Sequence, residues 1–172
     1  MGFDFAPRID AAAGVATGEV VAGDIGTEGS RNFTVIGNTV NVAARLQGAA
    51  KTYGAPIVVS EATWAAAGDA FVFRELDTLR LKGRRTPERI FALVEEPAAV
   101  SDGQRRLFET YGRALAPYRA GDWAAAEAGF ATCLDLAADD VAAAVMRRRC
   151  QVLAQHPPAG WDGIWGSLEE RP

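Results

Sequence analysis

The 172-residue chain is poor in the residues that build metal centres and disulfide frameworks. It has one histidine, His156, and two cysteines, Cys133 and Cys150. A histidine-based metal site is therefore excluded, because such sites gather several Cys or His ligands. Both cysteines fall in helical patterns without a partner spacing. We expect two small buried apolar side chains in a reducing, cytoplasmic protein rather than a disulfide.

Long apolar runs and an excess of one charge are also missing. No stretch approaches the roughly 20 consecutive apolar residues of a membrane-spanning helix, and the N-terminal sequence MGFDFAPRID lacks the pattern of a secretory signal. The net charge is −4, and neither half of the chain is markedly basic. We therefore expect no nucleic-acid binding and no membrane contact. The 49% apolar and 23% charged composition is ordinary for a globular protein.

Residues 1–97 carry alternating strand and helix signals. The pattern predicts the order β-β-β-α-β-α-β-β, an α+β fold with helices on one face of a mostly antiparallel sheet. Asn38 is the expected N-cap of the first helix, Gly54 its C-cap and Ser60 the N-cap of the second helix. The strands are expected near residues 8–16, 19–25, 32–37, 56–60, 70–83 and 88–95.

Residues 98–172 change to an Ala-, Leu- and Arg-rich helical pattern. A break at Gly121–Asp122 separates two helices, and Ala126, Phe130 and Cys133 would share one face. This segment resembles one tetratricopeptide-type (TPR-like) unit, and a single unit needs a cover. We expect it to pack on the first region or on a partner. Two tryptophans in the tail, within PPAGWDGIWGSLEE, are expected to clamp it onto an apolar surface.

The stretch NFTVIGNTVNVAARL (residues 32–46) places Asn41 and Arg45 four residues apart on one face of an otherwise apolar helix. An amide, a fixed cation and the positive end of a helix dipole together suit a phosphate. The alternative is a local cap and a solvated surface arginine, and the spacing alone leaves both interpretations open.

The surrounding motifs GVATGEVVAGDIG, NFTVIGNTVNVAARL and LRLKG resemble the later half of the catalytic domain of class III nucleotidyl cyclases, over about residues 8–96. The resemblance implies the C-terminal part of a ferredoxin-like cyclase domain, which converts ATP to cyclic AMP and pyrophosphate in signal transduction. It implies an active site at a dimer interface, formed in a homodimer or with a complementing cyclase protomer.

The resemblance also implies roles for four residues. Asn41 orients the ribose and Arg45 stabilises the triphosphate in the transition state. Thr34 contacts the purine edge, and a hydroxyl there favours ATP, with GTP as the open alternative. Lys82, in LKG, reaches the phosphates, or is a solvated turn lysine.

The resemblance further implies two Mg or Mn ions, bound by aspartates in an earlier half of the domain. This chain has no candidate for them at a suitable place: Asp4 only superficially matches the expected motif, and Glu19, Asp24 and Glu28 are expected at the surface or in turns. We expect the metal ligands on missing N-terminal sequence or on a partner chain, and no activity from this chain alone. The alternative is an inactive cyclase-like scaffold that recruits a protein through its helical segment.

Overall fold

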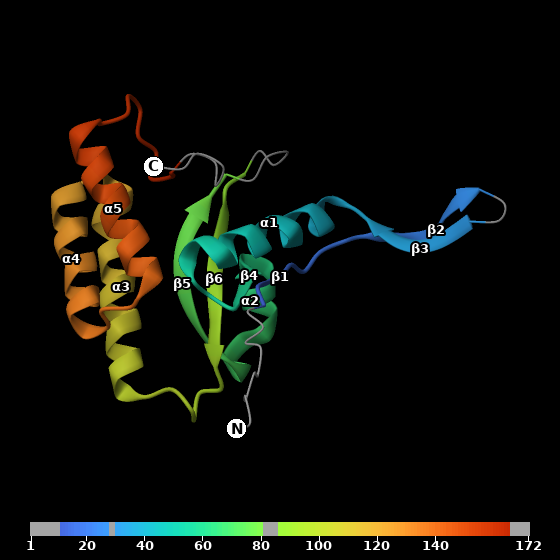
Figure 1. Cartoon of the computed structure of the whole chain (residues 1–172), viewed down its shortest axis with the longest axis horizontal. Coiled ribbons are helices and arrows are strands. Elements are labelled where there is room, and N and C mark those ends of the chain that lie inside the picture. The colour runs from blue at the N-terminus through green and yellow to red at the C-terminus, as the bar shows by residue number, and fades with distance from the viewer. Residues whose placement is uncertain (1–10, 28–29, 81–85, 166–172) are drawn as a thin grey trace, which may run out of the picture.

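The computed structural model describes residues 11–27, 30–80 and 86–165 (Figure 1). Its strands and helices follow the predicted order up to residue 95, and three helices follow. The elements are β1 (Ala13–Val15), β2 (Val21–Thr27), β3 (Ser30–Ile36), α1 (Asn38–Tyr53), β4 (Ile57–Ser60), α2 (Glu61–Ala67), η1 (Gly68–Ala70), β5 (Val72–Leu79), β6 (Glu88–Glu95), α3 (Asp102–Ala120), α4 (Trp123–Leu136) and α5 (Val141–Gln155).

Four strands form the main sheet in the order β1-β4-β6-β5. The β4–β6 and β6–β5 pairs are antiparallel and only β1–β4 is parallel, so the prediction of a mostly antiparallel sheet is confirmed. Strands β2 and β3 do not join this sheet. They pair only with each other, as an antiparallel hairpin that projects away from the rest of the molecule (Figure 1).

The helices cover both faces of the main sheet, so the prediction of one covered face is wrong. Ile90 and Ala92 of β6 belong to the hydrophobic core shared with α1 and the C-terminal helices. Phe91 points to the opposite face, because successive side chains of a strand alternate. There it stacks on Trp64 of α2, with ring centroids 4.7 Å apart. The short α2 therefore covers the face that α1 leaves open.

Helix α1 begins one residue earlier than predicted. Its N-cap is Gly37, with φ 154° and ψ 165° and no side-chain cap, so Asn38 is already helical. Only glycine adopts this backbone conformation readily, and a Cβ there would lie 3.3 Å from the Glu19 carbonyl oxygen. The other two predicted caps are confirmed: Gly54 ends α1 in the left-handed conformation, and the Ser60 hydroxyl accepts from the Thr63 amide.

Helices α3, α4 and α5 pack together into a C-terminal bundle. A capping box at Ser101 starts α3, and the left-handed Gly121 ends it, which confirms the predicted break. Ala126, Phe130 and Cys133 are all fully buried on one face of α4. Cys133 and Cys150 are both buried and unbridged, as predicted. Whether the bundle is TPR-like stays a prediction.

One hydrophobic core joins the sheet and the bundle. Its buried members come from α1, β4, β5 and β6 and also from all three bundle helices. We call this contact between the sheet and the bundle the seam. The tail packs beside it, where Trp161 lies edge-on against Tyr118 and Trp123 and donates to the Arg119 carbonyl at 3.2 Å. The expected packing of the helices on the first region is confirmed, whereas a domain boundary at residues 97–98 stays a prediction.

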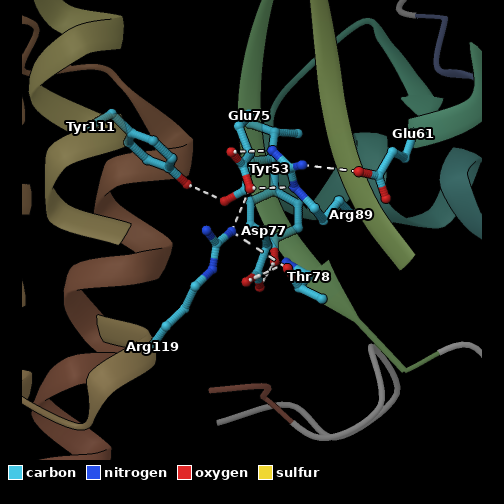
Figure 2. Close-up of polar contacts among 9 residues, drawn as sticks. Tyr53, Glu61, Glu75, Asp77, Thr78, Arg89, Tyr111 and Arg119 are labelled. Atoms are coloured by element: carbon cyan, nitrogen blue, oxygen red, sulfur yellow. Dashed lines mark hydrogen bonds and ion pairs between the residues drawn. The ribbon is translucent and has the colours of Figure 1, made fainter. Parts of the chain in front are cut away.

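Polar contacts reinforce this seam (Figure 2). The Tyr111 hydroxyl of α3 donates to the Leu76 carbonyl of β5 at 2.8 Å. Glu75 of β5 accepts from Arg119 of α3 at 2.5 Å and from Arg89 of β6 at 2.9 Å, and Arg89 also pairs with Glu61 of α2. The bundle is thus bonded to strand β5 as well as packed against it. Within the described ranges, no helix has the length and apolarity to cross a bilayer.

Candidate functional site

Asn41 and Arg45 lie on one flank of α1, as predicted from their spacing. Val42, Leu46 and Ala49 of the same helix point into the core, whereas Asn41 is exposed and Arg45 is half-buried. Among the residues that the structure describes, neither side chain has a hydrogen-bond or ion-pair partner. This differs from Arg74, Arg89, Arg119 and Arg149, which all pair with a carboxylate.

The backbone at the start of α1 corrects one part of the anion-site hypothesis. Because the helix begins at Asn38, the Asn41 amide already donates to the Gly37 carbonyl, at 3.5 Å. Only the amides before Asn41 precede the first helical hydrogen bond. Asn41 can therefore contribute its side chain to an anion, but its N–H group is committed to the helix.

Thr34 lies on β3 of the projecting hairpin, opposite Gly23. Cross-strand partners share a face, so Thr34 lies on the same face as the Val21–Ile36 pair. Both of these side chains are more than half exposed, at 67% and 52%. Thr34 thus adds a hydroxyl to an apolar surface that nothing in the described part of the chain covers.

The structure describes only some of the remaining candidate residues. Lys82, Asp4 and Glu28 lie outside the described residues, so their positions stay untested. Glu19 and Asp24 are exposed, as expected of turn and surface positions. The structure therefore brings together Asn41 and Arg45, and leaves Thr34 on a hairpin that leads into the same helix through Gly37 (Figure 1).

A cavity of about 780 Å³ opens beside the first turn of α1, but none of the described candidates, Thr34, Asn41 and Arg45, lines it. Its walls are the turn after β1, the starts of α1 and α2, and residues 86–88. Three glutamates, Glu19, Glu61 and Glu88, are among its lining residues. The described candidates therefore lie on an open surface of the chain rather than in this cavity.

The described residues do not fit a two-metal centre. No three His, Cys, Asp or Glu side chains in the described ranges lie close enough together to hold a metal ion. Asp77, the most buried aspartate, is already occupied by Tyr53, Thr78 and Arg149. We therefore assign no metal-dependent step to side chains of this part of the chain.

Two features of the structure were not predicted from the sequence. The first is the polar seam, where Arg149 falls on the apolar stripe of α5 between Met146 and Leu153, a spacing that could have marked it as buried. The second is the exposed apolar surface of the hairpin, which includes Phe33 at 72% exposure. Its alternating apolar residues read equally well as an ordinary sheet strand.

The comparisons with known proteins agree on one family. The family model for the adenylate and guanylate cyclase catalytic domain matches residues 6–95, just over half of the chain. Adenylate cyclase 1 of Rhizobium meliloti (strain 1021) is 38% identical over 95 residues, which cover 55% of this chain and 14% of that protein. The terminal-differentiation specific adenylate cyclase of Dictyostelium discoideum is 26% identical over 160 residues, 87% of this chain and 7% of that protein.

The crystal structure of the adenylyl cyclase CyaB from P. aeruginosa is 26% identical, with a TM-score of 0.44 over 51% of this chain and 44% of that one. The chain thus spans only a small part of the length of the two curated relatives described above. The family assignment rests on the family model, whose match takes in β1 through β6. The chain belongs to the family of adenylate and guanylate cyclase catalytic domains.

Proposed function

We propose that this chain supplies the nucleotide side of a cyclase active site, which is completed by a second protomer and converts ATP to cyclic AMP and pyrophosphate. In this proposal Asn41 orients the ribose, Arg45 stabilises charge that develops on the phosphates, Thr34 contacts the purine edge, and Lys82 reaches the phosphates. The observation that carries the proposal is the state of Asn41 and Arg45, which share an accessible flank of α1 and have no partner in the described part of the chain.

An arginine in this state is suited to act on a ligand. A guanidinium that is not neutralised by a carboxylate keeps its charge and its planar set of donors for phosphate oxygens. The other buried or half-buried arginines of the sheet and seam are committed to Glu61, Glu75, Asp77 and Asp140. The first turn of α1 adds a positive dipole end that no acidic residue of that turn offsets.

A second protomer is proposed because the described site residues, Thr34, Asn41 and Arg45, do not enclose a cavity. Thr34 stands on the projecting hairpin, and the flank of α1 is open (Figure 1). The hairpin presents Val21 and Ile36 to solvent on the face of Thr34 and Phe33 on the opposite face, and exposed apolar surface of this kind is typical of interaction sites. A partner that covers the hairpin would close the nucleotide between the two chains.

The proposed cofactors are two Mg or Mn ions. Their ligands are assigned to the complementing protomer or to sequence outside this chain, since the described residues offer no suitable cluster. When bound, such ions activate the attacking hydroxyl and hold the triphosphate. The residues of this chain act beside them: Arg45 as a fixed cation, Asn41 as an amide that orients the sugar, and Thr34 as a donor and acceptor for the purine.

A radiolabelled ATP assay with magnesium or manganese tests the proposal. The chain alone is expected to make no cyclic AMP. A partner cyclase domain that keeps its metal aspartates but has lost its own Asn and Arg is expected to be inactive alone and active in the mixture. Robust activity of the chain alone would contradict the proposed division of the site. A proven heterodimer without activity would contradict its catalytic role.

The second candidate is an inactive scaffold that recruits a protein through the bundle. The lack of a metal-binding cluster in the described ranges favours it. A groove of about 350 Å³ between α3 and α4 is lined by Arg106 and Arg113 together with the apolar Ala114 and Leu136, and it suits an acidic segment with an apolar side chain. The complementation assay separates the two candidates, because a scaffold cannot restore turnover.

A further inference from the structure

A buried polar node joins the last helix of the bundle to the end of α1. Nη1 of Arg149, on α5, donates to Asp77 Oδ2 at 2.7 Å and to the Tyr53 hydroxyl at 2.8 Å. The Tyr53 hydroxyl in turn donates to the same Asp77 oxygen at 2.7 Å. The Arg149 and Asp77 side chains are only 4% and 1% exposed. Three elements that are far apart in the sequence therefore meet in one closed triangle of hydrogen bonds.

An irregularity in β5 turns Asp77 toward this node. The pairing of β5 with β6 shifts between Glu75 and Asp77, so that Glu75 lies opposite Phe91 and Asp77 opposite Ile90. Without the shift, Glu75 and Asp77 would share a face. With it, Glu75 stays on the α2 side while Asp77 turns to the bundle side, and bulges of this kind commonly re-aim a side chain.

The node is poorly explained as a source of stability. Burial raises the pKa of Asp77, although the Arg149 guanidinium, the Tyr53 hydroxyl and the Thr78 amide oppose that shift. Arg149 Nε is buried and has no hydrogen-bond partner in the described part of the chain. Buried ion pairs often cost as much in desolvation as they return, and their best-attested role is to fix the register of packed elements.

The element whose position the node fixes is α1. Tyr53 is the last residue of this helix. The next residue, Gly54, packs so closely on α5 that a Cβ there would lie 2.7 Å from the Cβ of Val141. The other end of α1 has no side-chain cap and leads to the projecting hairpin. The helix that carries Asn41 and Arg45 is thus tied to α5 at its C-terminal end, while β1 packs on its middle, where a Cβ on Gly14 would lie 2.1 Å from the Ala43 carbonyl oxygen.

We propose that Arg149 is a positioning residue, which holds α1 in the orientation that its nucleotide-binding flank requires by clamping Tyr53 against Asp77. This inference rests on the proposed function only for its catalytic consequence. The anchoring of α1 by the bundle can be measured in the chain by itself. The bundle then acts as a part of the catalytic unit, and a change in the packing of α5 changes the position of Arg45.

Hydrogen exchange by mass spectrometry tests the anchor directly. Arg149→Met and the milder Tyr53→Phe are expected to raise exchange of the amides of residues 38–53 by about tenfold. The control is Arg74→Met, which removes another largely buried ion pair, to Asp140 at 2.5 Å, between β5 and the start of α5. Arg74 makes no hydrogen bond or ion pair with α1 among the described residues, and its loss should destabilise the protein without this local effect. Tyr53→Phe keeps the test decisive if Arg149→Met does not fold.

Kinetics in the complemented enzyme give the second measurement. With Tyr53→Phe, kcat is expected to fall about tenfold while KM for ATP changes less, because Arg45 acts mainly in the transition state. If no mixture is active, the proposed function fails and the exchange experiment still decides this inference. Exchange in residues 38–53 that matches wild type in both variants, or that rises equally in Arg74→Met, would overturn it.

Discussion

The side chains of the hairpin and those of the seam differ in their burial and in their pairing. Along the seam, tyrosines, arginines and carboxylates are paired, and Tyr53, Asp77 and Arg149 are almost completely buried. On the hairpin, Val21, Phe33 and Ile36 are exposed, and β2 and β3 pair only with each other. The flank of α1 with Asn41 and Arg45 lies between the two regions and is accessible like the hairpin. The contrast indicates where charged side chains find their partners within the chain and where we propose that a ligand or a second chain supplies them.

Removing the bundle should have the largest effect on this contrast. A chain cut after residue 100 loses the cover of Leu76 and Ile90 and leaves Asp77 and Arg74 without their ion-pair partners. Unpaired buried charges and lost core contacts each cost several kcal/mol. We expect no cooperative thermal transition and low solubility, measured by circular dichroism and by the soluble fraction. A chain cut after residue 155 lacks only the tail and is expected to melt cooperatively. If the chain cut after residue 100 melted at the temperature of the full-length protein, the contacts between the sheet and the bundle would be dispensable for folding.

Arg45→Ala tests whether the accessible flank of α1 acts on the nucleotide. The loss of one fixed donor to charge that develops in the transition state lowers the rate by about 10²–10³-fold. We expect this loss in the complemented enzyme, with little change in the stability of the chain, because Arg45 has no partner in the described residues. The measurement is kcat for ATP together with the melting temperature. Lys51→Ala, an exposed cation nearer the C-terminal end of the same helix, should leave both unchanged.

The prediction for Arg45 would be contradicted by a fall in stability without a fall in rate. That result would place the residue in the structure of α1 rather than in the site. Asn41→Ala is expected to lower kcat for ATP as well.

The hairpin tests whether the exposed apolar surface serves association. The cross-strand pair Val21→Ser and Ile36→Ser removes two apolar side chains from one face. Because the pair is mostly exposed, we expect the stability of the monomer to change by less than about 0.5 kcal/mol. Each buried aliphatic side chain contributes about 1.5–3 kcal/mol to an interface, so self-association or pairing with a cyclase partner should weaken by at least about tenfold.

Sedimentation equilibrium measures this association. Phe71→Ser is the matched control, since Phe71 is an exposed apolar residue just before β5, remote from the hairpin in sequence. Equal effects of the two changes, or a wild-type chain that stays monomeric at tens of micromolar with and without a cyclase partner, would remove the hairpin from the proposed interface.

Local signals predicted most of the secondary structure, and non-local placement accounts for what they missed. The order of strands and helices and the caps at Gly54 and Ser60 follow from periodicity and from residues with strong positional preferences. The separation of the hairpin from the main sheet and the packing of Trp64 on Phe91 depend on contacts between distant segments. Periodicity identifies a strand, but it does not name the strand's partner.

The candidate site shows the same limit. The spacing of Asn41 and Arg45 placed both on one flank of α1, and the structure agrees. Asn38 was expected as the cap because its side chain favours that position, yet Gly37 takes it through a backbone conformation that asparagine rarely adopts. The node around Arg149 depends on a register shift in β5, which has no simple sequence pattern.

The smallest expected effect concerns the exposed edge of the seam and its dependence on pH. Burial alone would raise the pKa of Glu75, but hydrogen bonds and charge from Arg89 and Arg119 prevail and lower it from its ordinary value of 4.5. A carboxylate with a lowered pKa in the folded state stabilises the fold above its unfolded pKa, and this contribution is lost as the pH falls through the folded value.

Because Arg89 and Arg119 are 38% and 35% exposed, solvent screens the pairs, and Glu75→Gln should cost only about 1 kcal/mol at pH 7. Urea unfolding of both proteins should show this difference at pH 7 and a progressively smaller one below pH 4.5. Glu109→Gln, in the solvent-exposed pair with Arg113, should change stability little at either pH, and a Glu75→Gln cost that did not shrink in acid would mean that packing, rather than charge, sets the contribution of Glu75.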